Sequence, residues 1–525
     1  SVFFRPRSMA ICESSVQSRS VKRKMLFMNG AVYLIGAGPG DPGLITVRGA
    51  ELLAKADIVL YDGLSNPELL LHAPKAEQIC VGKHGKTRIW KQNEIIDEIL
   101  RHAKAGKIVV RLKGGDPAVF ARTAEEVEAV IEAGLPLEIV PGITAALAAG
   151  SFAGIPVTHR GLASAVALVT GHEEPSKSES ALDWDALARF PGTLVIYMGV
   201  TTAESWTQAL LQAGKAPDTP AALVRRCSLP DQQTIHCRLD EVAAQLNPAS
   251  RFRPPVIVIL GAVTQLAKTM SWIQDRPLLG KTVLVTRPQG QAEALAKPLR
   301  EQGARVLLQP AIAIESPEDW KPVDSAIAQL SEYDMLIFCS HNGVQFFLNR
   351  LEERGEDMRA LAGLEIGCIG KKTASALHQF HLQTDLMPDT FHAEAMANHI
   401  GPRANSKRIM VIRASRGNDQ LSRQLETLGA DVTQVIAYQH SDVPECAASI
   451  EAAALNGEID WVTVTSSATA QSLHHMFSES MNDMKIASLS PVTSKTLVDL
   501  GYSITAEANP YTIEALVEAL VKAEK

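Results

Sequence analysis

Short apolar runs alternate with helical patterns over the first half of the chain. Residues 32–35, 58–61, 108–112, 137–140, 166–170, 194–198, 221–224 and 256–260 are rich in β-branched residues and predict strands. Helical spacing lies between several of them, for example over residues 46–55 and 123–132. This alternation is typical of α/β layers with largely parallel sheets.

The second half of the chain contains an internal repeat. Identical residues align at an offset of 126 residues: Lys281 with Lys407, Val285 with Val411, Arg287 with Arg413, Gly303 with Gly429, Asp334 with Asp460 and Ser340 with Ser466. At an offset of 120, Thr373 aligns with Thr493. Each copy has the pattern of an α/β unit, so two similar lobes with a ligand-binding cleft between them are predicted.

The pattern changes at residues 271–279, where Arg276-Pro277 ends a helix-like stretch. We therefore predict an α/β module of two lobes at 31–270, a linker at 271–279, and a second α/β module of two lobes at 280–525. In the second module, lobe one is expected to comprise 280–311 and 443–525, and lobe two 315–436.

Composition narrows the class of protein. Of 525 residues, 46% are hydrophobic and 21% charged, which are globular values. The net charge of −7 disfavours a general nucleic-acid binder. The seven cysteines are scattered without a C-x-x-C spacing, so we expect no disulfide framework, no metal site and a cytoplasmic location. The charge-free run 139–158 is interrupted by proline and glycine, and no membrane span is expected.

Residues 1–30 differ from the rest in charge. They carry six basic residues and one acid, net +5, which leaves −12 for residues 31–525. We predict that these residues are either a disordered basic tail or an over-extended start of the sequence upstream of Met25 or Met28. An organelle transit peptide is the alternative.

Glycine-rich loops follow the predicted strands at Gly36-Ala37-Gly38-Pro39-Gly40-Asp41-Pro42-Gly43, Lys113-Gly114-Gly115-Asp116-Pro117 and Pro141-Gly142-Ile143-Thr144. A further signal, Tyr197-Met198-Gly199, lies at a strand end. Loops at the carboxyl ends of parallel strands converge on one crevice, where glycine lets the backbone approach a ligand. The first loop does not fit the dinucleotide fingerprint, because prolines interrupt it.

The order of these loops, with R-L-K-G-G-D-P and G-I-P-V-T-H-R, resembles the uroporphyrinogen-III C-methyltransferases of the tetrapyrrole methylase family over residues 31–263. The resemblance implies S-adenosylmethionine as methyl donor, uroporphyrinogen III as acceptor, precorrin-2 as product, and a homodimer. The cofactor pocket that it implies comprises Pro39, Gly114, Gly115, Asp116, Val119, Thr144, Ala145, Met198 and Cys227.

The resemblance also implies catalytic roles. Asp62 matches the proton acceptor, with a helix cap as the alternative, and Lys83 matches the proton donor, with a carboxylate clamp as the alternative. A base is useful because a methylated pyrrole carbon must lose a proton. The acceptor carries eight carboxylates, so we predict a cationic substrate-binding rim formed by Arg111, Lys113, Arg122, His159 and Arg160.

Two positions depart from the family pattern. Ala121-Arg122-Thr123-Ala124 replaces a Gly-Arg-Gly-Gly sequence, and Cys227-Ser228 replaces Gly-Thr. The dehydrogenase and ferrochelatase module that is fused to some relatives has no room before Ala31, so we expect neither NAD-dependent oxidation nor iron insertion.

Residues 279–520 resemble the uroporphyrinogen-III synthases, through Val285-Thr286-Arg287-Pro288, residues 338–344, Thr465-Ser466-Ser467, Ser490-Pro491-Val492-Thr493 and Tyr511-Thr512. The resemblance implies closure of hydroxymethylbilane to uroporphyrinogen III with inversion of ring D, without metal or organic cofactor. Positioned hydroxyl donors suit this chemistry. We predict Tyr438 as acid or donor, and Ser340, Ser466, Ser467, Thr493 and Arg287 as substrate ligands. Helix capping, turn formation and a structural ion pair are the alternatives.

The sequence therefore predicts a bifunctional enzyme that acts on tetrapyrroles, with neither nucleic acid nor membrane as partner. Three alternatives remain open: a methyltransferase whose C-terminal half is a ligand-binding or interaction module, an RNA methyltransferase, and a dinucleotide-dependent oxidoreductase. The end product of the pathway, siroheme, cobalamin or another compound, is not predicted.

Overall fold

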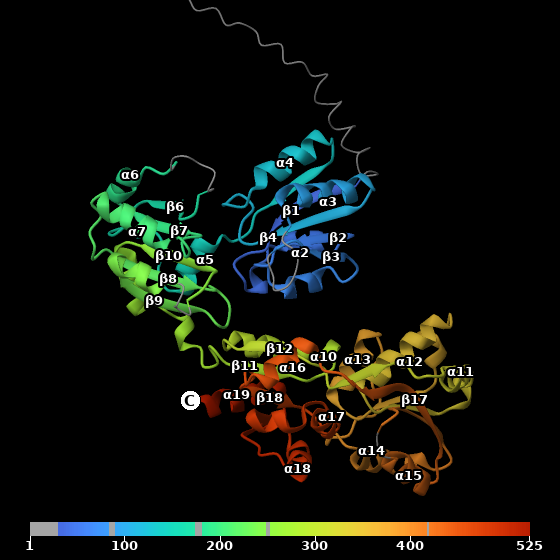
Figure 1. Ribbon diagram of the computed structural model, residues 1–525. Coiled ribbons are helices and arrows are strands. Elements are labelled where there is room, and N and C mark those ends of the chain that lie inside the picture. The colour runs from blue at the N-terminus through green and yellow to red at the C-terminus, as the bar shows by residue number, and fades with distance from the viewer. Residues whose placement is uncertain (1–29, 83–89, 174–180, 248–251, 417–418) are drawn as a thin grey trace, which may run out of the picture. The chain divides into compact units, whose positions relative to one another are not determined.

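The computed structural model describes residues 30–82, 90–173, 181–247, 252–416 and 419–525 (Figure 1). The predicted tail, apart from Gly30, and Lys83 lie outside these residues. The chain forms two compact units, Ser1–Lys281 with Gln302–Arg305, and Thr282–Glu301 with Val306–Lys525. Within the described ranges, no helix combines the length and the apolar character needed to span a membrane.

The first lobe of the N-terminal unit is a parallel five-stranded sheet in the order β3-β2-β4-β1-β5. Its elements are β1 (Ala31–Gly36), α2 (Val47–Leu53), β2 (Ile58–Tyr61), β3 (Glu77–Cys80), α3 (Gln92–Lys104), β4 (Ile108–Lys113), α4 (Thr123–Glu132) and β5 (Leu137–Val140). Alternate residues of β1 join separate apolar clusters, Ile35 with α2 and Leu34 with α3. Both faces of the sheet are therefore covered, as parallel sheets require.

The second lobe is a mixed sheet in the order β6-β7-β10-β8-β9. Its elements are α5 (Ala145–Phe152), β6 (Val166–Thr170), α6 (Trp184–Arg189), β7 (Thr193–Tyr197), α7 (Ala203–Gln212), β8 (Pro220–Arg225), β9 (Gln233–Arg238), α8 (Val242–Gln245), β10 (Val256–Leu260) and α9 (Ala267–Met270). Only β6 and β7 pair in parallel. The prediction of largely parallel sheets is wrong for this lobe, because β8 and β9 form a hairpin that needs no crossover helix.

The C-terminal unit holds two more five-stranded sheets, ordered β12-β11-β18-β19-β20 and β13-β17-β16-β14-β15. Its strands are β11 (Thr282–Val285), β12 (Arg305–Leu308), β13 (Ile312–Glu315), β14 (Met335–Phe338), β15 (Glu365–Cys368), β16 (Arg408–Ala414), β17 (Asp431–Asp442), β18 (Trp461–Val464), β19 (Lys485–Ser488) and β20 (Ala506–Glu507). Its helices are α10 (Gln289–Glu301), α11 (Lys321–Ala328), α12 (His341–Glu353), α13 (Lys371–Gln379), α14 (Ala393–Ile400), α15 (Gln420–Thr427), α16 (Ala448–Leu455), α17 (Ser467–Phe477), α18 (Pro491–Asp499) and α19 (Ile513–Glu524).

The structure confirms the sequence repeat and shows how its copies share the sheets. Strands β11 and β12 of the first copy pair into one sheet with β18 and β19 of the second, while β16 and β17 of the second pair with β14 and β15 of the first. The repeated aspartates Asp334 and Asp460 form hydrogen bonds that link the two copies within each sheet. Asp334 accepts from the Arg408 amide at 2.9 Å, and Asp460 accepts from the Thr282 amide, at the equivalent position, at 2.8 Å.

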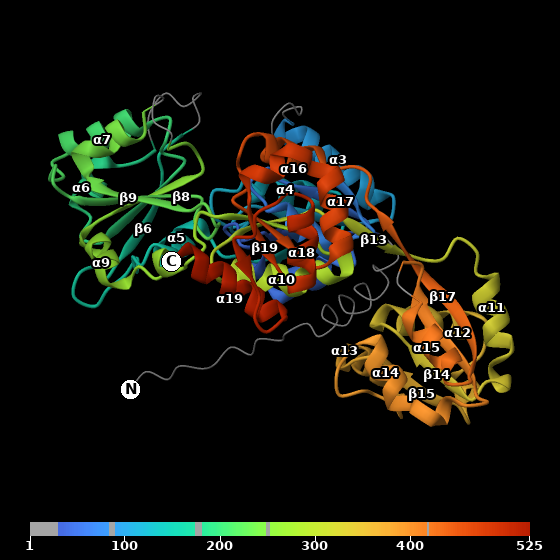
Figure 2. The ribbon, with the colours of Figure 1, turned by 90° about the horizontal axis from the view of Figure 1, so that it is seen from below.

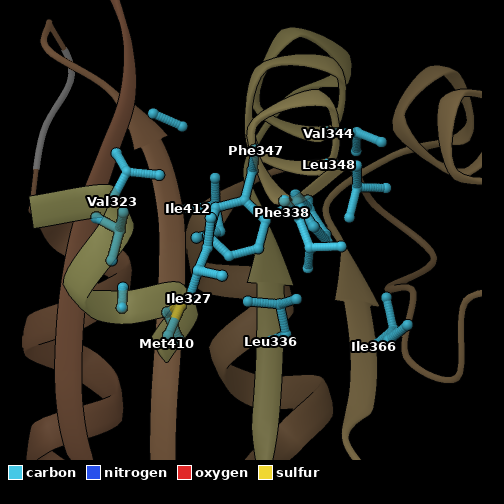
Figure 3. Close-up of a cluster of buried hydrophobic side chains, with 14 of the residues drawn as sticks. Val323, Ile327, Leu336, Phe338, Val344, Phe347, Leu348, Ile366, Met410 and Ile412 are labelled. Atoms are coloured by element: carbon cyan, nitrogen blue, oxygen red, sulfur yellow. The ribbon is translucent and has the colours of Figure 1, made fainter. Parts of the chain in front are cut away.

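Figure 2 shows the helices and strands of the lobe around β14, and Figure 3 shows the side chains of its core. Apolar positions of α12 recur with helical spacing at residues 344, 347, 348 and 351, so they form one buried stripe. Figure 3 shows Phe347 reaching from α12 toward the sheet, between Phe338 and Ile412. The Phe338 and Phe347 rings meet edge to face with centroids 6.0 Å apart.

Candidate active sites

Three glycine loops meet at the carboxyl edge of the first sheet. The Gly38 amide donates to the Gly115 carbonyl at 3.1 Å, and the Gly115 amide donates back at 2.8 Å. A Cβ atom on Gly142 would lie 2.2 Å from the Gly115 oxygen, so no side chain fits there. The predicted convergence of these loops is confirmed: the absence of side chains at these glycines lets the three loop backbones pack directly against one another.

Asp116 joins two of these loops. Its carboxylate accepts from the Ala118 amide at 2.7 Å and from the Gly142 amide at 2.9 Å. Gly115 beside it has φ +69°, and a Cβ atom there would meet no atom closer than 3.8 Å. Asp116 therefore fixes the loop geometry, and Gly115 supplies the left-handed backbone conformation beside it.

The second lobe contributes a buried tyrosine to the same region. The Tyr197 hydroxyl lies 2.6 Å from Thr144 Oγ1 and accepts from the Ala146 amide at 2.9 Å. Burial raises the pKa of Tyr197 above its usual value. The Phe120 ring lies 5.1 Å from the Tyr197 ring. Tyr197 is absent from the site residues that the sequence predicts, although its position at the end of a strand before Met198 was a signal.

Strained backbone gathers around these loops. Among the described residues, seven non-glycine residues have φ in the left-handed region, and Phe120, Arg122, Met198, Arg226 and Ser228 are five of them. Such conformations cost free energy and cluster at functional sites. The strain therefore marks the same region as a site.

The remaining residues of the predicted cofactor pocket lie in or beside these loops. Ser228 Oγ accepts from the Asp41 amide at 3.0 Å, which ties the β8–β9 loop to the loop that contains Pro39. Val119 and Ala145 pack against the core of the second lobe, and Cys227 Sγ lies 3.9 Å from the Ala145 oxygen. Burial raises the pKa of Cys227 to about 12, so this thiol is packing rather than a nucleophile. Gly114 lies against Leu64.

Asp62 belongs to a buried network of charges. Arg111 Nη2 donates to Asp62 at 2.5 Å, Arg111 Nε lies 3.4 Å from Glu126, and Lys113 Nζ lies 2.6 Å from Glu126. Gln92 donates to the same glutamate at 3.0 Å. The exposed fractions of Arg111, Lys113 and Glu126 are 3%, 2% and 1%, whereas the Asp62 side chain is 31% exposed.

This network corrects the expected rim. Arg111 and Lys113 do not lie on the surface, because their cations are used internally by the two carboxylates. Burial lowers the pKa of Lys113 although Glu126 raises it. Sequence reasoning missed Glu126, whose one signal was an acidic pair in the first turn of α4. Asp62 is not a helix cap: its partner is Arg111.

The other residues predicted to bind substrate in this unit are exposed. Arg122 pairs with Glu125 at 2.8 Å, and His159 and Arg160 lie on the surface beyond α5. Gly82 packs against the backbone of Asp62 and Gly63, where a Cβ atom would approach to 2.0 Å. Lys83 comes next in the chain but is not among the described residues.

In the C-terminal unit, Tyr438 and Ser340 come together. Their hydroxyl oxygens are 2.8 Å apart, and the Tyr438 ring stacks on Phe346 with centroids 5.7 Å apart. Burial raises the pKa of Tyr438, against the opposing effect of hydrogen bonds with Ser340 and Asn342. The phenol is therefore protonated, and its orientation is set by Ser340 at the N-cap of α12 and by Asn342 and Phe346 on α12.

The predicted hydroxyl ligands also cap helices. Ser340 Oγ accepts from the Gly343 amide, and the repeat-equivalent Ser466 Oγ accepts from the Thr469 amide, both at 3.1 Å. Helix α18 is capped by Ser490, and the buried Thr493 lies 3.1 Å from the Ser490 hydroxyl. Ser467 accepts from Thr496 at 2.8 Å.

Arg287, the last residue predicted to bind substrate, has an unusual environment. Its Nη2 donates to Gln291 Oε1 at 3.0 Å, but its buried Nε has no hydrogen-bond partner in the structure.

No group of three or more metal-ligating side chains occurs among the described residues.

Comparison with known proteins identifies the two units. The family model for Tetrapyrrole (Corrin/Porphyrin) Methylases matches residues 31–243, and that for Uroporphyrinogen-III synthase HemD matches residues 293–518. Two α/β modules with these matches define an enzyme of tetrapyrrole biosynthesis.

Relatives of known name cover both units. The porphyrin biosynthesis protein HemD of Ruminiclostridium josui is 34% identical over 494 residues, 93% of this chain and 95% of that protein. The uroporphyrinogen-III C-methyltransferase of Bacillus subtilis (strain 168) is 37% identical over 369 residues, 70% of this chain and 75% of that protein. The chain belongs to the family that fuses a uroporphyrinogen-III C-methyltransferase with a uroporphyrinogen-III synthase, which confirms both resemblances.

Among solved structures, the uroporphyrin-III C-methyl transferase of Thermus thermophilus, complexed with S-adenyl homocysteine, is 44% identical. It covers 45% of this chain and 100% of its own, with a TM-score of 0.40.

Proposed function

We propose that the C-terminal unit closes hydroxymethylbilane to uroporphyrinogen III with inversion of ring D, and that the N-terminal unit methylates uroporphyrinogen III twice to give precorrin-2. The observation that carries this proposal is the presence of both family matches in one chain. The product of the proposed synthase is the substrate of the proposed methyltransferase, so the two steps are consecutive.

In the N-terminal unit, the glycine loops suit a nucleoside-containing cofactor, since at Gly114 and Gly115 no side chain covers the backbone and a ligand can approach it closely. Residues from both lobes would hold S-adenosylmethionine: Pro39, Gly114, Gly115, Asp116, Val119, Thr144, Ala145, Met198 and Cys227. When bound, this cofactor supplies the methyl group.

Asp62 is the proposed base for the proton that a methylated pyrrole carbon must lose. The carboxylate fits this task because it is the partly exposed member of a network whose other members are buried. Arg111 Nη2 donates to Asp62 Oδ1 at 2.5 Å and so holds the carboxylate in place. Glu126 in turn holds Arg111 and Lys113 through ion pairs. We keep Lys83 as the proposed proton donor, on the resemblance alone.

An acceptor with eight carboxylates needs cations at the surface. Arg122, His159 and Arg160 are the exposed candidates in this unit. Arg122 already pairs with Glu125 on the surface, and such pairs are weak enough for a substrate carboxylate to compete.

In the C-terminal unit, Tyr438 is the proposed donor of the proton with which the hydroxyl leaves hydroxymethylbilane as water, and the proton that the closing pyrrole carbon loses restores the balance. Ser340 orients the phenol, and a neutral phenol can donate a hydrogen bond without carrying charge. Ser466, Ser467, Thr493 and Arg287 are proposed to position the folded chain, so that inverted closure outcompetes the spontaneous, uninverted one. This step requires no cofactor.

We further propose a cytoplasmic homodimer, joined through the methyltransferase unit, with small tetrapyrroles rather than nucleic acid or membrane as partners.

Each half has its own test. Hydroxymethylbilane alone should give mainly the type III isomer, and Tyr438→Phe should shift the product toward type I. Uroporphyrinogen III with S-adenosylmethionine should give a product heavier by two methyl groups, and Asp62→Asn should abolish it. Formation of type I alone by the unmodified chain would support a methyltransferase with a C-terminal binding module instead.

A further inference from the structure

Three basic side chains gather where the lobes of the C-terminal unit meet. Arg287 follows β11 in lobe one, His341 begins α12 in lobe two, and Lys372 lies in the first turn of α13. Gln291 on α10 joins them, because it accepts from Arg287 at 3.0 Å and its Nε2 lies 3.3 Å from His341 Nε2.

The cluster has no acidic partner among the described residues. No ion pair there involves Arg287, His341 or Lys372, and Arg287 Nε is buried without any acceptor. Burial, followed by Lys372 and Arg287, lowers the pKa of His341 to about 4. Burial and then Arg287 lower the pKa of Lys372. His341, whose pKa lies well below neutral, is uncharged at neutral pH, so Arg287 and Lys372 are the two cations, and an anion would supply the counter-charge that no acidic side chain among the described residues provides.

The repeat provides an internal comparison. Arg413 occupies the position equivalent to Arg287; it forms an ion pair with Asp419 and donates a hydrogen bond to Gln434 Oε1 at 2.6 Å. The residue equivalent to Asp419 is Glu293, which instead pairs with Arg300 at 2.8 Å. The residue equivalent to Gln434 is Leu308, whose side chain has no hydrogen-bond acceptor. At this position of the fold, Arg413 in the second copy therefore has an acidic partner, whereas Arg287 in the first copy has none among the described residues.

We propose that Arg287, His341 and Lys372 form a carboxylate site that spans the two lobes and binds one acetate or propionate group of the linear tetrapyrrole. This assignment rests on the proposed synthase function. Arginine offers paired donors to a carboxylate, lysine adds a charge, and histidine adds a donor.

The site is next to the proposed acid. His341 directly follows Ser340, whose hydroxyl contacts Tyr438. A substrate held by its carboxylate at His341 therefore lies beside the phenol. Because the cations come from both lobes, the bound carboxylate also holds the lobes together around the substrate.

The test compares Lys372→Gln with Lys371→Gln. Both lysines are exposed neighbours on α13, but Lys371 lies over the Phe391 ring, 6.0 Å from its centroid, and is outside the cluster. We expect Lys372→Gln to raise KM for hydroxymethylbilane about tenfold or more, the range for a lost bond to a charged group, with kcat within about twofold. Lys371→Gln should leave both unchanged.

Arg287→Gln should raise KM at least as much, and Arg287→Lys should recover part of the loss. Methyltransferase activity of each variant reports whether the chain is intact. A binding arm uses uroporphyrin III, a stable tetrapyrrole with the same carboxylates. Because the methyltransferase unit is also proposed to bind this type of ring, two sites are fitted, and the affinity of one should fall in parallel while that of the other stays unchanged.

Two results would overturn the site. One is equal KM and equal uroporphyrin affinity for Lys372→Gln and the unmodified chain, in an enzyme that makes the type III isomer. The other is calorimetric binding of inorganic phosphate that Lys372→Gln abolishes while uroporphyrin affinity is unchanged, which would assign the cluster to a free anion. Failure of the proposed function is distinct, because then the unmodified chain makes no type III isomer.

Discussion

Glu126 offers the sharpest test of the charge network beneath Asp62. Its side chain is fully buried, and it accepts from Lys113 at 2.6 Å, from Gln92 at 3.0 Å and from Arg111 at 3.4 Å. Glu126→Gln keeps the shape and removes the charge. The two buried cations are then left with one carboxylate, that of Asp62, which is itself partly exposed.

The expected loss is large. Removing one partner from a buried ion pair typically costs about 3–5 kcal/mol, because the remaining charge is left uncompensated. Asp62 still neutralises part of the charge, so we expect about 3 kcal/mol. At tenfold per 1.4 kcal/mol, this equals roughly a hundredfold rise in the population of opened molecules.

Amide hydrogen exchange of the full chain measures this effect locally. Peptides from β1 and β4, the interior strands of the first sheet, should exchange about a hundredfold faster in Glu126→Gln. Peptides from β14 and β18 in the other unit serve as an internal control and should not change. This readout avoids a single unfolding midpoint, which is ill defined for a chain of two units.

A second variant separates charge from packing. Adding Lys113→Met to Glu126→Gln leaves Arg111 and Asp62 as a balanced pair, and neutral replacement of a buried pair is often tolerated. The double variant should recover most of the lost protection. An acceleration below about tenfold in the single variant, or no recovery in the double, would refute the account of the network.

Other substitutions test separate features. Gly142→Ala would place a Cβ atom 2.2 Å from a backbone oxygen, so calorimetry should show about tenfold or greater loss of S-adenosylhomocysteine affinity while closure of hydroxymethylbilane persists. Ser466→Ala should cost about 1 kcal/mol in local exchange as a lost helix cap, and Ser340→Ala more, because it also loses the contact with Tyr438. Burial raises the pKa of Cys227 to about 12, so its thiol stays protonated at pH 8 and should not react with iodoacetamide. Mass spectrometry of the peptide that contains Cys227 should therefore find the label only after denaturant exposes this residue.

The pattern of elements was readable from the sequence because apolar periodicity is local. The eight strands predicted in the first half all form, but β3 and β9 were missed, since their residues are largely polar or half-exposed. Strand direction in the second lobe was mispredicted, because a hairpin and a crossover have similar apolar runs. The repeat was found because its two copies keep a spacing of 126 residues from Lys281 to Ser340, before the spacing changes to 120 at Thr373.

The sites were only partly predictable. Glycine loops are contiguous motifs, so their meeting point followed from the rule that parallel strands end at one edge. Whether a basic residue is exposed depends on partners distant in sequence. Arg111 and Lys113 looked like a surface rim until Glu126, on the next helix, proved to be their partner. The cluster of Arg287 and His341 depends on contact between lobes, which no local pattern encodes.

The central claim is that one chain carries out both steps, and a single incubation tests it most directly. The unmodified chain receives hydroxymethylbilane and S-adenosylmethionine together, and products are identified by mass and isomer. We predict a doubly methylated product of the type III series, with type III uroporphyrinogen as the intermediate, and no methylated product from Asp62→Asn. Accumulation of unmethylated type I uroporphyrinogen by the unmodified chain would contradict the claim.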